Sequence, residues 1–172
     1  KLVDNPSAGP LPPPRGANNG TSAYSGLIPN TSRTLALTKT GTGTLTLSGA
    51  NTYSGDTTIS EGTVKLGGGS AIPDGAGKGN VVMSGTSTLD LGGSSETING
   101  LSGVWGDGVD CRCGWSLTLT GGGNNVNSGY AGRIEHTRRT VTLPQPGTGT
   151  VQVSDVTDPS RDPRTPAWTA AP

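Results

Sequence analysis

The chain has 172 residues, with twelve basic and twelve acidic side chains and no formal net charge at neutral pH. This balance removes the electrostatic reason to expect nucleic acid or an anionic membrane as a partner, and no apolar stretch approaches the length of a membrane-spanning helix. Glycine is abundant at 30 residues and phenylalanine is absent, so any core must be thin and aliphatic. The length fits one domain or one segment of a longer array.

The N-terminal segment, residues 1–23, is rich in Pro, Gly and Asn and includes Pro10-Leu-Pro-Pro-Pro14. Proline cannot donate a hydrogen bond to a sheet, so we predict that residues 1–23 form a linker or a cap. The chain begins at Lys1 and shows no signal peptide, which we interpret as a fragment or as a chain whose leader was removed.

From residue 34 onward, apolar and hydroxyl residues alternate in short runs that glycines interrupt. Alternation with a period of two predicts β-strands with one buried face. The predicted strands span residues 34–38, 44–48, 57–60, 63–66, 80–84, 87–91, 96–98, 116–120, 140–143 and 150–154. The side chains predicted to point inward are Leu35, Leu37, Leu45, Leu47, Ile59, Val64, Leu66, Val82, Leu89, Leu91, Ile98, Leu101, Leu117, Leu119, Val141, Leu143, Val151 and Val153.

Part of this pattern recurs further along the chain. Tyr24 and Ile28 recur as Tyr130 and Ile134, both at the same offset in the sequence. Repetition of short strands at a fixed offset indicates a stacked, quasi-one-dimensional fold whose surface is built by repetition. Such a fold leaves two sheet edges at its ends. We expect at least one end to be covered by a terminal segment or by another copy, which makes self-association through the edges possible.

The run from Leu37 to Gly67, LTKTGTGTLTLSGANTYSGDTTISEGTVKLG, resembles the passenger-associated transport repeat of bacterial autotransporters. Asp56, Val64 and Lys65 are its departures from the family pattern. The resemblance implies an all-β fold, a right-handed parallel β-helix or solenoid, in a secreted passenger at the cell surface. It supplies no catalytic residue, cofactor or metal ligand to transfer.

The composition changes beyond residue 104, where all three Trp, both Cys and most of the Arg residues lie. We predict that residues 24–154 form the solenoid repeats and that residues 155–172 form an irregular Arg/Pro-rich tail. Two origins of the altered C-terminal part stay open: a divergent terminal coil followed by a linker, and an out-of-frame reading of the gene.

Cys111 and Cys113 are the two thiols of the chain. A structural zinc ion needs four ligands, and the chain has a single histidine with no second cysteine pair. A disulfide between residues two apart is strained. We interpret both as loop thiols without a role. In an oxidising compartment, the strained disulfide between them and an intermolecular bridge both stay open.

His136 is the one histidine, so any Ser-His-Asp arrangement must use it. The chain has no Gly-x-Ser-x-Gly turn, and we expect His136 to be exposed and structural. The acids Asp56, Glu61, Asp74, Asp90, Glu96, Asp107 and Asp110 are spread singly along the sequence, with Asp90 pointing outward. Cleavage of a polysaccharide would need clustered acids on one face, and stacking of the coils could bring two of these acids together.

We predict a structural function: a surface-displayed passenger fragment that acts as a stalk, spacer or adhesin, located extracellularly or on the bacterial cell surface. Glycans or other cell-surface molecules are the expected partners. The alternative is a secreted hydrolase of polysaccharide or ester substrates, with His136 as its weak catalytic candidate. A third hypothesis is a flat threonine array that binds ice or glycan, which would require a regular Thr-x-Thr pattern on one face.

Overall fold

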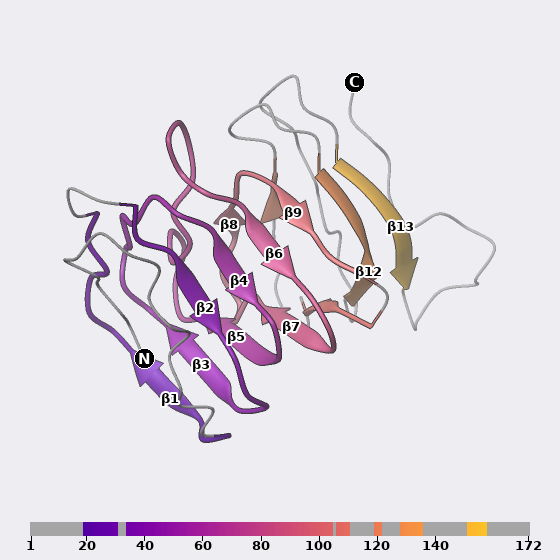
Figure 1. The fold of residues 1–172 in the computed structure, drawn as a ribbon, viewed down its shortest axis with the longest axis horizontal. Coiled ribbons are helices and arrows are strands. Elements are labelled where there is room, and N and C mark those ends of the chain that lie inside the picture. Colours follow the sequence, from indigo (N-terminus) through magenta and orange to yellow (C-terminus); the bar gives the residue numbers. More distant parts are fainter. Residues whose placement is uncertain are drawn as a thin grey trace.

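The structure, a computed structural model, describes residues 19–30, 34–104, 106–110, 119–121, 128–135 and 151–157. These residues form strands and turns (Figure 1). Their strands are β1 (Ser22–Tyr24), β2 (Leu37–Lys39), β3 (Thr44–Leu47), β4 (Thr57–Ile59), β5 (Gly62–Leu66), β6 (Val81–Met83), β7 (Ser87–Asp90), β8 (Glu96–Thr97), β9 (Leu101–Ser102), β10 (Gly108–Asp110), β11 (Leu119–Thr120), β12 (Ser128–Glu135) and β13 (Val151–Thr157). In this described part, no helix is long and apolar enough to cross a bilayer.

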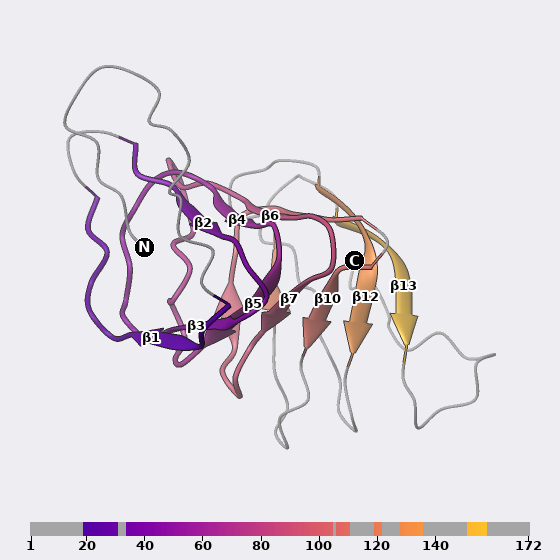
Figure 2. The same cartoon turned by 60° about the horizontal axis from the view of Figure 1, so that its bottom comes forward.

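The strands stack into three sheets that wrap around one core. The largest sheet has the order β1-β3-β5-β7-β10-β12-β13, the second has β2-β4-β6-β9, and the third pairs β8 with β11. Every strand pair is parallel. Figure 2 shows the seven-stranded sheet as one layer with β2, β4 and β6 opposite it. The predicted all-β fold, a stack of parallel coils, is therefore confirmed.

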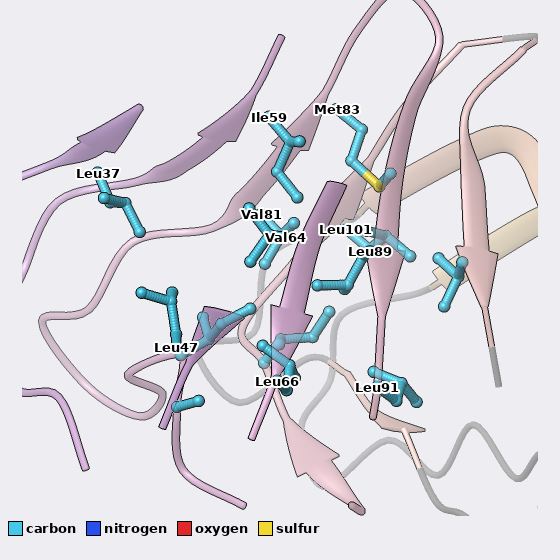
Figure 3. Close-up of a cluster of buried hydrophobic side chains, with 14 of the residues drawn as sticks. Leu37, Leu47, Ile59, Val64, Leu66, Val81, Met83, Leu89, Leu91 and Leu101 are labelled. Carbon is cyan, nitrogen blue, oxygen red and sulfur yellow. The ribbon is translucent and has the colours of Figure 1, made fainter. Parts of the chain in front are cut away.

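Aliphatic side chains form continuous columns through the core. On the seven-stranded sheet, one such column runs through the paired residues Leu45, Val64, Leu89, Val109 and Ile134. Leu45 is partly buried at its start, and the other four are buried. Figure 3 shows how side chains from both large sheets meet in this core. Each coil thus buries only a few side chains, and burial accumulates by stacking.

The inward prediction holds for most described positions but is wrong for Val82. Thr57 pairs with Val81 and Ile59 with Met83, so the buried face of β4 continues through Val81 and Met83. Val82 lies between them and is only partly buried. In the run of apolar residues 81–83, alternation does not select a face, and the register with β4 decides it.

Four stretches form strands that the sequence pattern did not predict. These are β1, β9, β10 and β12. The first three offer only two or three residues, too few for a period to be visible, and their strand character comes from pairing with the neighbouring coil.

The constant offset that relates Ile28 to Ile134 in the sequence does not mark equivalent positions in the coils. Ile134 belongs to the Leu45 column through its pairing with Val109. Ile28 lies at another corner, where its carbonyl accepts from the N–H of Thr52. Along the Leu45 column, the sequence spacing between successive members alternates between shorter and longer intervals. Because coil length varies, a constant sequence offset drifts out of phase with the stack.

Some predictions fall outside the described residues. They include the strand at 140–143 and the inward side chains of Leu117, Val141 and Leu143. Val151 and Val153 lie in β13, but their side chains are not described. The division into residues 1–23, 24–154 and 155–172 stays a prediction.

Candidate functional site

Three candidate site residues from the sequence lie outside the described residues: His136, Cys111 and Cys113. Their predicted roles therefore stay predictions. Within the described part of the chain, no three or more His, Cys, Asp or Glu side chains are grouped so as to hold a metal ion. The described surface and interior contain two other polar arrangements.

The first arrangement is on the outer face of the seven-stranded sheet. Residues that alternate with the inward column point away from the core. Thr44, Thr63 and Thr88 occupy paired positions on three successive strands of this sheet. We call them the hydroxyl row. Only β3, with Thr44 and Thr46, has the Thr-x-Thr pattern, so the described face is not the regular array that an ice binder requires.

A second row on this face, which we call the charged row, contains Thr46, Lys65, Asp90 and Asp110 at paired positions. The ammonium of Lys65 lies 3.1 Å from Asp90 Oδ2, and both side chains are in contact with solvent. The backbone of Glu135 continues the register after Asp110. An exposed ion pair of this kind contributes at most about 1 kcal/mol to folding, so the charged row adds little to stability.

Asp90 points outward, as predicted. Stacking also places Asp90 and Asp110, which lie apart in the sequence, at paired positions on β7 and β10. The number of residues between Asp90 and Asp110 predicts their pairing only if the length of the coil between them is known. Because coil length varies, the sequence alone does not predict this pairing.

The second arrangement lies inside one corner and connects successive coils. The N–H of Ile28 donates to Asn51 Oδ1 at 2.9 Å, and Asn51 Nδ2 donates to the carbonyl of Ala71 at 2.7 Å. The N–H groups of Ala71 and Ile72 donate to the two carboxyl oxygens of Glu96, at 3.3 and 3.0 Å. We call this set the polar ladder. It satisfies backbone groups at a corner where no sheet pairing does so.

Glu96 is the titratable group of this ladder, with 2% of its surface exposed. Burial raises the pKa of Glu96 to about 7, the hydrogen bonds from the backbone of residues 70–72 oppose that rise, and Asp74 adds to it. In the sequence, Glu96 is one of several acids that occur singly. The alternation Glu96-x-Ile98 nevertheless puts it on the same face as the inward Ile98.

Two other buried charged side chains bind the backbone. Asp107 accepts hydrogen bonds from the N–H of Ser87 at 3.2 Å, the hydroxyl of Ser87 at 2.9 Å and the N–H of Val104 at 2.8 Å. Lys39 donates to the carbonyls of Thr40, Gly41 and Glu61. Burial lowers the pKa of Lys39, and the Glu61 carboxylate opposes this. These groups fix turns and coil stacking, and the described interior presents no pair poised for acid–base chemistry.

Stacked parallel coils, aliphatic columns, an interior polar ladder and outward polar rows define a parallel β-solenoid with a repetitive surface. Residues 37–66 match the family described as the passenger-associated-transport-repeat. Residues 37–66 are thus an autotransporter passenger repeat, as the sequence resemblance predicts.

A curated relative points the same way. The chain is 38% identical over 114 residues to a protein named Adhesin BmaC autotransporter from Brucella suis biovar 1 (strain 1330). The matched region covers 66% of this chain but only 3% of that relative's length. No solved structure matches the chain.

Proposed function

We propose that this chain is a structural segment of a surface-displayed autotransporter passenger, with an adhesin-like role on its outer face. The passenger-associated transport repeat at residues 37–66 carries the proposal. The name of the Brucella relative supports the adhesin-like part. The stacked core supplies a rigid rod, and the outward rows supply polar groups at the spacing of adjacent strands. Glycans or other cell-surface molecules are the partners that fit such hydroxyl and charged groups.

No described feature favours the hydrolase alternative. The buried acids Glu96 and Asp107 are engaged with backbone groups, and Asp90 is paired with Lys65. A structural segment needs no such chemistry, because its function depends on folding and on what its surface presents.

The test uses three consecutive residues of β5 with opposite orientations. The chain is displayed on bacteria through a secretion leader and a translocator barrel. Protease resistance on intact cells measures folded display, and attachment to host cells is compared with that of the barrel alone. Val64→Asp, which places a charge in the core, should abolish resistant display. The outward double variant Thr63→Ala/Lys65→Ala should retain display and reduce attachment.

Retention of the wild-type chain inside the cell would contradict the proposal, as would normal display of Val64→Asp. Display without any attachment above the barrel control would restrict the role to a spacer.

A further inference from the structure

Strand β1 lies at one end of the seven-stranded sheet and pairs with β3. The part of the chain that the structure describes places no strand on its other side. All three residues of β1 are exposed. A parallel strand whose outer side is paired with no other described strand is a template for a further strand.

The core is also open to solvent at this end. Tyr24 pairs with Leu47, which pairs with Leu66, so Tyr24 belongs to an inward column. Leu47 is 1% exposed and Leu66 is fully buried, whereas Tyr24 is 38% exposed. Leu27, whose carbonyl accepts from the Tyr24 hydroxyl at 3.3 Å, is 54% exposed. A further coil would bury Tyr24 as β5 buries Leu47.

The backbone of β1 is oriented for this pairing. The N–H of Ser48 donates to the carbonyl of Tyr24 at 3.0 Å, so the peptide groups of Ser22 and Tyr24 face β3. In a parallel sheet, the N–H and carbonyl groups of successive residues point toward opposite neighbouring strands. The N–H and carbonyl of Ala23 therefore face away from β3. A strand added at this edge would bond to Ala23.

We propose that the β1 edge docks the β13 edge of a second copy of this chain, head to tail. Each described coil stacks on the next by parallel pairing, and among the described strands β13 is the last of the same all-parallel sheet at its opposite side. Translation of a second copy along the stack therefore places its β13 parallel to β1 and continues the existing interface. Contact between two β1 edges would make the strands antiparallel and break that continuity. Head-to-tail docking is heterologous and does not close, so it extends beyond dimers.

Sedimentation velocity over a range of protein concentrations, with reductant to keep both cysteines as thiols, tests the proposal. The wild-type chain should form species larger than dimers as concentration rises. Ala23→Pro removes the N–H that faces the edge without removing a bond to β3, and should weaken association at least tenfold. The matched control is Val104→Lys, which changes another exposed apolar residue, 52% exposed and remote from β1, and should associate like the wild type.

Circular dichroism checks that Ala23→Pro folds, and the double variant Tyr24→Lys/Leu27→Lys replaces it if it does not. A wild-type chain that is monomeric at every concentration, or edge variants that associate like the wild type, would overturn the proposal.

A mixing experiment tests the direction of docking. Ala23→Pro retains its β13 edge, so an excess of it should cap labelled wild-type chains and shorten their assemblies. Assemblies that stop at the dimer, or that ignore the added variant, would show docking through two β1 edges and refute the head-to-tail arrangement.

Discussion

Replacing Glu96 by glutamine should remove a pH dependence of stability that the polar ladder builds into the solenoid. Glu96 is buried and accepts hydrogen bonds from the N–H groups of Ala71 and Ile72. Its pKa is raised to about 7 from the ordinary value of 4.5, because burial penalises the carboxylate more than the two amides stabilise it. Glutamine keeps one acceptor oxygen and cannot ionise.

Proton linkage determines whether this stability rises or falls with pH. A carboxyl whose pKa is raised in the folded state binds its proton more tightly when folded. Protonated Glu96 therefore adds its full share to the free energy of unfolding below pH 4.5. That share is lost as the pH rises through about 7. The interval from 4.5 to about 7, at about 1.4 kcal/mol for each pH unit, sets an upper limit of about 3 kcal/mol.

The assay is urea unfolding followed by far-ultraviolet circular dichroism at pH 4.5, 5.5, 6.5 and 7.5. The stability advantage of the wild type over Glu96→Gln should shrink as the pH rises. Hydrogen exchange at residues 70–72, corrected for intrinsic rates, should report the same loss locally. Asp74→Asn is the control, because it alters an exposed carboxylate that influences Glu96, and it should retain most of the slope. An equal slope in the wild type and in Glu96→Gln would refute the reasoning.

Three further predictions concern the stack itself, and urea unfolding measures each of them. Leu89→Ala should cost about 2–5 kcal/mol, because Leu89 is fully buried in the central column; a loss below about 1 kcal/mol would contradict that column. Val81→Asp should prevent folding while Val82→Asp is tolerated, because only Val81 continues the buried face of β4; equal effects would contradict the register. Gly92→Ala should cost more than about 1 kcal/mol, because Gly92 has φ +59° and an added Cβ would lie 1.8 Å from the carbonyl oxygen of Leu66; wild-type stability would contradict that turn geometry.

The sequence predicted the parallel coils well where alternation was long and interrupted by glycine. Leu45-x-Leu47 and Val64-x-Leu66 show their inward faces directly, and the register pairs them as expected. The run at residues 81–83 carries no alternation, and there the prediction chose Val82 wrongly. Its face is fixed by β4, a neighbour in space whose register the local sequence does not encode.

The sequence did not predict the polar ladder or the charged row. For the charged row, the cause is again that pairing depends on a neighbouring coil. The pairing of Asp90 with Asp110 depends on the number of residues that each coil uses, and that number varies. Glu96 was different, since its alternation with Ile98 was visible in the sequence. The sequence led to no predicted orientation for Glu96. Acids are seldom buried, although buried backbone amides can hold a carboxylate inside a fold.

Variable coil length is tolerated because side chains replace sheet pairing at the places where coils differ. The column interval from Val64 to Leu89 includes a turn around residues 73–79. Asn99 of the next coil ties this turn by accepting from the N–H of Gly75 and donating to the carbonyls of Gly75 and Lys78, at 2.8, 3.0 and 2.8 Å. Other corners are held by similar side-chain hydrogen bonds to the backbone, made by Asn51, Glu96 and Asp107. These inward polar residues therefore hold the coils together alongside the aliphatic columns. Outward positions such as Thr63 and Lys65 make no such interior contact, so substitutions there should leave the fold intact.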